Sequence, residues 1–159
     1  MVQLRSYRKQ DLAGMHQLDQ VCFPQEIAYS KAELQHFLNH PRCFCWIAEQ
    51  PDRKLAGFVI IERARRSGLA AGHIVTLDVD PSARRRGLGT LLMQAAENQM
   101  KREGAGLMSL EVAENNATAL QFYRGLGFVN KGRIAKYYGG SVDAEIMEKV
   151  IYPSPLARP

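Results

Sequence analysis

The segment from Val79 to Thr90 (VDPSARRRGLGT) holds the residues with the clearest chemical potential. It leads from the end of an apolar, strand-like stretch through a basic loop with two glycines into an amphipathic helix. Glycines let backbone N–H groups approach a ligand closely, and a helix N-terminus offers unsatisfied N–H donors and partial positive charge. The arginines from Arg84 to Arg86 add full charges. The segment therefore predicts a pyrophosphate-binding loop beyond the carboxyl end of a strand.

Two familiar phosphate-binding loops match this segment poorly. The segment is not G-x-G-x-x-G, and no Gly-Lys-Ser/Thr follows, so dinucleotide-binding and P-loop readings are poor. A plain solvated basic turn remains an alternative, because a run of three arginines and a glycine is often just that. The strand–loop–helix setting favours phosphate binding.

The surrounding elements follow from apolar periodicity. Ser30 and Glu33 form a capping-box pattern that opens one helix. We expect alternating faces in the strand over 73–79, with His73, Val75, Leu77 and Val79 on one side and Ile74, Thr76 and Asp78 on the other. The longest helix carries an apolar face of Leu88, Leu91, Leu92, Ala95, Ala96 and Met100. We expect strands over 2–7, 43–48, 55–61, 73–79, 107–112, 128–134 and 144–151, and helices over 11–21, 31–39, 88–102 and 116–124.

This order predicts an α/β domain with a mixed sheet, in which each strand–helix–strand unit makes neighbouring strands parallel. The length of 159 residues fits a single domain over 1–152, with a loose tail over 153–159. No apolar run approaches the roughly 18 residues of a membrane helix, and the N-terminus lacks a signal-peptide core. We expect no membrane partner.

Charge and cysteine usage narrow the class of protein further. The net charge of +5 favours an anionic partner without naming one. Cys22, Cys43 and Cys45 form no CxxC pair, so neither a disulfide framework nor a zinc site is indicated. They fit a reducing, cytoplasmic setting with mostly buried thiols. The histidines show no metal-ligand spacing, and we expect no metal site.

Several motifs in order now point to a family. Arg84-x-x-Gly87-x-Gly89 resembles the [QR]-x-x-G-x-[GA] acetyl-CoA loop of the GNAT superfamily of N-acetyltransferases. Further along, the chain resembles the ribosomal-protein-alanine N-acetyltransferase branch from about His73 to Met147, nearly half its length. The motifs that carry this likeness are Leu110-Glu111-Val112, Asn115-Asn116-Ala117, Phe122-Tyr123, Gly125-Leu126-Gly127-Phe128, Tyr137-Tyr138 and Asp143-Ala144-Glu145-Ile146-Met147.

The resemblance implies a GNAT-type mixed, largely antiparallel central sheet with helices on both faces, and acetyl-CoA as acetyl donor. Backbone groups of Leu77, Asp78 and Val79 would hold the pantetheine arm and the thioester carbonyl. Asn116 would contact the arm of the cofactor. The pyrophosphate would lie on the loop formed by Arg84, Arg85, Arg86, Gly87, Leu88, Gly89 and Thr90.

The same resemblance makes Glu111 the general base and Tyr123 the general acid. Asn116 and Tyr123 are seven residues apart and share a helix face, while Glu111 ends the preceding strand, so the three can converge. Each of the three also has an alternative, structural role: Tyr123 as a core aromatic, Glu111 as a solvent-facing carboxylate, and Asn116 as a helix cap.

The acceptor amine is less well defined. An N-terminal α-amine has a pKa near 8 and a lysine amine one near 10.4, so their deprotonation costs differ by about 3 kcal/mol. This favours the N-terminal amine of a protein or peptide. The segments 23–30 and 138–141 are expected to frame it. A small-molecule amine acetyltransferase and a non-catalytic acyl-CoA-binding regulator remain alternatives.

Nucleic-acid binding is not expected, because no helix carries a basic stripe. The chain is expected to be a monomer or homodimer.

Overall fold

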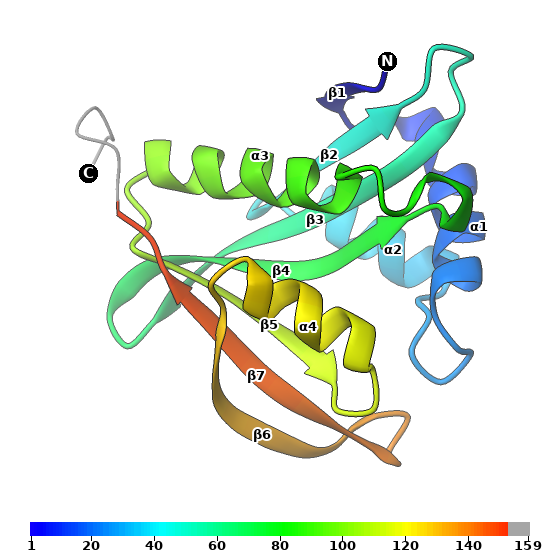
Figure 1. The fold of residues 1–159 in the computed structure, drawn as a ribbon. Helices are drawn as coiled ribbons and strands as arrows, with labels where there is room; N and C mark the ends of the chain where they lie inside the picture. The colour runs from blue at the N-terminus through cyan, green and yellow to red at the C-terminus, as the bar shows by residue number, and fades with distance from the viewer. Residues whose placement is uncertain (153–159) are drawn as a thin grey trace.

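The computed structural model describes residues 1–152. They form one continuous sheet with helices on both faces (Figure 1). Among the described residues the sheet has seven strands, in the order β1-β2-β3-β4-β5-β7-β6. Only β4 and β5 pair in parallel, so the expected mixed, largely antiparallel sheet is confirmed. The strands are β1 (Gln3–Ser6), β2 (Cys43–Glu49), β3 (Leu55–Arg66), β4 (Leu69–Val79), β5 (Leu107–Ala113), β6 (Val129–Tyr138) and β7 (Val142–Val150). The tail predicted over 153–159 lies outside the described residues.

The helices bury two separate apolar clusters against the two faces of the sheet. The helices are α1 (Leu12–Cys22), α2 (Lys31–Asn39), α3 (Leu88–Arg102) and α4 (Ala117–Gly125), with 3₁₀ turns at Lys9–Asp11 and Pro81–Ala83. One cluster joins α3 and α4 to the sheet, and the other joins α1 and α2 to the opposite face. No helix among residues 1–152 is long and apolar enough to cross a membrane.

Local sequence signals explain where the helices begin. The Ser30 side chain accepts a hydrogen bond from the Glu33 N–H at 3.1 Å, and the Glu33 carboxylate accepts one from the Ser30 N–H at 3.0 Å. This capping box starts α2 at Lys31, as predicted. The bounds of α3 also agree with the prediction, although Leu91 is 39% exposed and Met93 is buried in its place.

The predicted alternation along β4 is wrong because the strand carries a bulge. Ile60 of β3 pairs with Thr76 and Ile61 pairs with Ile74, so Val75 has no partner. The extra residue re-aims the side chains on either side of it. Ile74 therefore packs in the α3 cluster, with Leu77 against the same cluster, while Val75 packs against the α1–α2 cluster.

The topology around α4 also differs from the prediction. The unit β4–α3–β5 makes parallel neighbours, as expected. The unit β5–α4–β6 does not, because β7 inserts between β5 and β6 and pairs antiparallel with both. Strand β7 thus pairs with the edge of β5. In a simple repeat of strand–helix–strand units, β6 would have paired with that edge.

Candidate active site

The candidate site begins where β4 and β5 stop pairing. Their parallel ladder covers only three pairs and ends at His73 with Ser109. Beyond it the two strands diverge (Figure 1). The stretch from Ile74 to Val79 pairs with β3 alone, so its other edge has no strand partner among the described residues. The backbone of Leu77, Asp78 and Val79 lies on this open edge, where an extended ligand chain can hydrogen-bond to it.

The basic loop after β4 is closed by its own polar contacts. Asp80 accepts hydrogen bonds from the Ser82 N–H at 2.9 Å and from the Ser82 hydroxyl at 2.6 Å. Arg84 Nε donates to the Val79 carbonyl at 3.1 Å. The Arg84 side chain therefore holds the loop against the end of β4. Arg85 and Arg86 are exposed and make no ion pair within residues 1–152.

The start of α3 fits an anionic ligand. Gly87 is the N-cap with φ of +77°, and no side chain of the described residues caps the helix there. The first N–H groups of α3 are thus left for an anion. A Cβ on Gly87 would meet nothing within 4 Å, so space lies over the loop. Leu88 is buried in the core, so it can contribute only backbone. Thr90 is half-buried in the first turn.

At Gly89 the absence of a side chain matters for the packing of two helices rather than for the backbone conformation. A Cβ there would lie 3.1 Å from Cζ of Phe122, on α4. Its absence lets α3 and α4 approach each other beside the divergent strands. The motif glycines therefore divide their roles: Gly87 supplies the left-handed backbone of the turn, and Gly89 supplies the close approach of the two helices.

Two expected cofactor residues use their side chains for structure. Asp78 has no exposed surface, so only its backbone can reach a ligand at the open edge of β4. Asn116 caps α4 by accepting a hydrogen bond from the Ala119 N–H at 3.1 Å. The capping alternative for Asn116 is thereby confirmed. Its contact with the cofactor stays a prediction.

Glu111 lies on β5, two residues beyond the last parallel pair. Its side chain is 10% exposed and accepts a hydrogen bond from His73 Nε2 at 2.8 Å. Because an ionised carboxylate only accepts, the Nε2 of His73 carries the proton in this contact. The hydroxyl of Tyr137 donates to Glu111 at 3.3 Å, and Arg66 lies 3.8 Å away. Glu111 is therefore not a solvent-facing carboxylate.

These contacts set the charge state of Glu111. Burial acts to raise its pKa, but the hydrogen bond and charge of His73 and the charge of Arg66 outweigh it, so the pKa falls below its ordinary value. Glu111 is ionised at neutral pH. The sequence reasoning missed His73, which lies 38 residues away from Glu111 and meets it only through the parallel pairing of β4 and β5.

Tyr123 is held in an aromatic cluster on α4. Its ring packs edge-to-face against Phe122, with centroids 5.1 Å apart, and against Phe128 at 5.8 Å. It also packs against the α3 core cluster. Burial, and then the charge of Asp78, raise the pKa of Tyr123 well above its ordinary value. The hydroxyl stays protonated at neutral pH, and it has no hydrogen-bond partner among the described residues.

The two segments expected to frame the acceptor do meet. A Cβ on Gly139 would lie 3.1 Å from Cβ of Glu26, so the β6–β7 turn touches the α1–α2 loop. Tyr138 donates its hydroxyl to the Glu111 carbonyl at 3.2 Å. The charge of Glu111 also acts on Tyr29, from the α1–α2 loop. The two loops therefore touch each other, and Tyr138 and Tyr29 beside them lie near Glu111.

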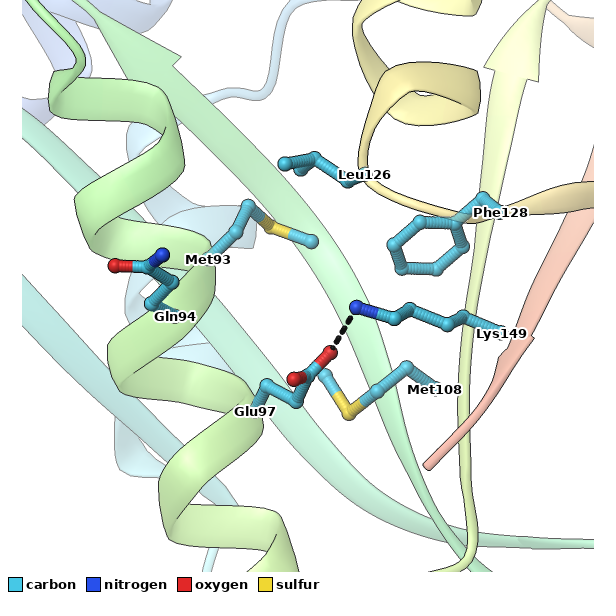
Figure 2. A pocket seen from close by; sticks show the side chains of 7 residues that line it. All are labelled: Met93, Gln94, Glu97, Met108, Leu126, Phe128 and Lys149. Atoms are coloured by element: carbon cyan, nitrogen blue, oxygen red, sulfur yellow. Dashed lines mark ion pairs between the residues drawn. The ribbon is translucent and has the colours of Figure 1, made fainter. Parts of the chain in front are cut away.

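One cavity and one cluster of possible metal ligands lie outside the predicted site residues, although Glu62 of the cluster is 3.9 Å from His73 Nδ1. A cavity of about 120 Å³ opens between α3, β5 and β7, where Glu97 and Lys149 form an ion pair of 2.7 Å (Figure 2). None of the predicted site residues lines it. His40, Cys43 and Glu62 bring their donor atoms within 4.8 Å of one another, a grouping that sequence spacing did not reveal. Arg42 and Arg63 act on Cys43 with positive charge, which opposes a cation there.

The cysteines only partly match the expectation of buried thiols. Cys45 is buried, whereas Cys22 and Cys43 are half-buried, and all three are free. Burial raises the pKa of both half-buried thiols to about 11, so they are poor nucleophiles at neutral pH.

Comparisons with known proteins agree with this geometry. The model of the acetyltransferase (GNAT) family matches residues 12–128. N-alpha-acetyltransferase 30 of Schizosaccharomyces pombe is 30% identical over 97% of this chain and 100% of its own length.

Two solved structures share the fold. The ribosomal-protein-S18-alanine N-acetyltransferase from Escherichia coli has a TM-score of 0.83 at 24% identity, covering 97% of this chain and 96% of that one. Arabidopsis thaliana NAA60, solved in complex with acetyl-CoA, also has a TM-score of 0.83 at 22% identity, covering 95% and 99%. The family model matches residues 12–128 and the relative aligns over its full length, in agreement with the diverging strands β4 and β5 and the uncapped start of α3. The chain therefore belongs to the GNAT family and is an acetyl-CoA-dependent N-acetyltransferase.

Proposed function

We propose that this enzyme acetylates the N-terminal α-amine of a protein or peptide, with Glu111 as general base and Tyr123 as general acid. The observation that carries the proposal is the position of Glu111. Its carboxylate is fixed by His73 and Tyr137, and the β6–β7 turn that follows Tyr137 touches the α1–α2 loop. An acceptor amine bound between these loops would lie close to an ionised carboxylate.

The electrostatics of Glu111 favour an α-amine over a lysine. Its lowered pKa makes it a good partner for an ammonium group but a weak base. An α-ammonium with a pKa near 8 is about a tenth neutral at pH 7, whereas a lysine near 10.4 is well below one part in a thousand neutral. The lysine therefore costs about 3 kcal/mol more to deprotonate. A weak base therefore suits the deprotonation of an α-ammonium better than that of a lysine.

Tyr123 suits the opposite proton transfer. Its raised pKa keeps the hydroxyl protonated at neutral pH, and its ring is fixed by Phe122 and Phe128. Attack of the amine on the thioester forms the amide bond and breaks the carbon–sulfur bond, and the leaving thiolate takes up a proton. With a pKa near 8.5, that thiolate needs only mild assistance. Tyr123 can supply it from a rigid position.

Acetyl-CoA fits the region where β4 and β5 diverge and the uncapped start of α3. The open edge of β4 from Leu77 to Val79 would receive the pantetheine arm, and the N–H groups around Gly87 to Thr90 would receive the pyrophosphate. When bound, the cofactor supplies the activated acetyl group. The relatives lend support to the acceptor: a protein named as an N-alpha-acetyltransferase aligns over the whole of its own length.

An acceptor panel tests this proposal. Release of CoA from acetyl-CoA is measured with short peptides bearing free N-termini, with the same peptides N-blocked but bearing lysine, and with polyamines and aminoglycosides. We expect turnover only with free N-termini. Turnover only with small amines would retain the donor chemistry and refute the acceptor. Tight acetyl-CoA binding without any turnover would favour a non-catalytic acyl-CoA-binding regulator.

A further inference from the structure

Two aspartates are buried against each other between α1 and β4. Asp19 and Asp78 both have no exposed surface, and their side chains lie within hydrogen-bonding reach of one another. Asp78 Oδ1 accepts the Thr76 hydroxyl at 2.6 Å, and Asp19 Oδ2 accepts the Tyr29 N–H at 2.6 Å. This leaves Asp19 Oδ1 and Asp78 Oδ2 buried and without a donor among the described residues.

A single proton resolves this arrangement. Two ionised carboxylates in contact, away from water, repel each other and pay the full desolvation cost. If one carboxyl is protonated, its O–H donates to the other, and both orphaned oxygens are satisfied. The cation that acts on Asp78 is Arg84, whose Nε is already used on the Val79 carbonyl. The other titratable groups facing Asp78 are Cys22, Cys45 and Tyr123, all neutral at pH 7.

Asp19 also holds both ends of the α1–α2 loop. Its backbone carbonyl accepts the Phe23 N–H at 3.1 Å, where the loop leaves α1. Its carboxylate accepts the Tyr29 N–H, just before α2. Gln20, the next residue, donates its side-chain amide to the Tyr29 carbonyl at 2.9 Å. The loop from Phe23 to Tyr29 is therefore tied to Asp19, whose side chain contacts Asp78.

We propose that Asp19 and Asp78 share one proton, and that this proton-bridged pair positions the acceptor loop against the strand that carries the acetyl donor. The positioning role rests on the proposed function, because it takes the α1–α2 loop as the acceptor side. The shared proton does not depend on it. Asp19 and Asp78 are positioning residues: Asp19 acts on the acceptor through Tyr29, and Asp78 links the loop to the backbone of Leu77 to Val79.

The shared proton makes a prediction about stability and pH. Burial, followed by the hydrogen bond and charge of Asp19, raises the pKa of Asp78 well above its ordinary value. A pKa that is higher in the folded than in the unfolded state stabilises the fold at low pH, and the stabilisation is lost as pH rises through the folded value. The wild type should therefore lose stability between about pH 4, the unfolded value, and the pH at which the pair ionises.

The reference for this test is the double variant Asp19→Asn/Asp78→Asn. Its amides can reproduce the contacts with Tyr29, Thr76 and each other without any titratable group. Denaturant unfolding is measured from pH 5 to pH 9. We expect the unfolding constant of the wild type to rise relative to the double variant by up to about tenfold per pH unit. Asp52→Asn, in an exposed turn, should follow the wild type. Parallel profiles of wild type and double variant would refute the shared proton.

A measurement on the native chain keeps the proposal testable if the double variant does not fold. Infrared spectroscopy of the wild type at pH 7 should show the C=O band of a protonated carboxyl, which Asp19→Asn or Asp78→Asn should remove. Absence of that band in the wild type would overturn the shared proton.

The positioning role has its own readout. Asp19→Ala should raise the KM for an acceptor peptide at least tenfold, change acetyl-CoA affinity less than about twofold, and be rescued by Asp19→Asn. An unchanged peptide KM would refute the positioning role. Lack of turnover by the wild type with every peptide would instead refute the proposed function, and the unfolding and infrared results would still decide whether the proton is shared.

Discussion

Replacing Glu111 with Gln removes the proposed base while preserving the volume of the side chain. The amide can still accept a hydrogen bond from His73 Nε2, which lies 2.8 Å from the native carboxylate, so the local structure should persist. General-base catalysis typically contributes about 10² to 10⁴ in rate, or roughly 3 to 5 kcal/mol. We expect kcat/KM at pH 7 to fall by about 10² to 10³, with acetyl-CoA affinity unchanged.

The size of this loss should depend on pH. An α-amine with a pKa near 8 is about one-tenth neutral at pH 7 and about nine-tenths neutral at pH 9. Raising the pH therefore supplies the variant with free amine that Glu111 would otherwise generate. The deficit of Glu111→Gln should shrink by up to about tenfold between pH 7 and pH 9.

The assay is CoA release from an Ala-first peptide at both pH values, with melting temperatures recorded alongside. Glu114→Gln is the matched control, since Glu114 is an exposed carboxylate on the same chain segment, paired with Arg133 at 3.1 Å. A loss that is equal at pH 7 and pH 9, or that is confined to the KM of the peptide, would refute Glu111 as the base and make it a binding residue.

Three further substitutions test other parts of the site. Tyr123→Phe should lower kcat at least about tenfold with little effect on acetyl-CoA affinity, and equal losses in both would make Tyr123 a packing residue. Gly87→Glu should abolish acetyl-CoA binding in calorimetry, because it places bulk and negative charge in the loop at a φ of +77°; the exposed Gly125→Glu is its control, and retained affinity would contradict the placement of the pyrophosphate. Gly72→Ala would put a Cβ 2.6 Å from Cγ of Met100 and should cost about 1 to 3 kcal/mol in denaturant unfolding; a neutral effect would mean that the core yields there.

Sequence patterns located the elements because their signals are local. The Ser30–Glu33 capping box and the apolar face of α3 each lie within a few residues, and both helices begin where expected. The loop expected to bind the pyrophosphate was recognisable for the same reason. Its glycines, arginines and helix start are contiguous along the chain.

The features that sequence reasoning missed depend on pairing between distant segments. The bulge at Val75 shows only when β4 is aligned with β3. The insertion of β7 between β5 and β6 is decided by the pairing of whole strands. The contact of His73 with Glu111 requires the parallel register of two strands, and that of Asp19 with Asp78 requires α1 to pack on β4. No local periodicity encodes these contacts.

The choice between amines is tested most directly by a single peptide that offers both. An Ala-first peptide with a free N-terminus and one internal lysine is incubated with the enzyme and acetyl-CoA at pH 7, and fragmentation mass spectrometry locates the acetyl group. We predict acetylation at the N-terminal α-amine, with the lysine unmodified during the first turnovers. Acetylation of the lysine in preference to the N-terminus would contradict the proposed acceptor.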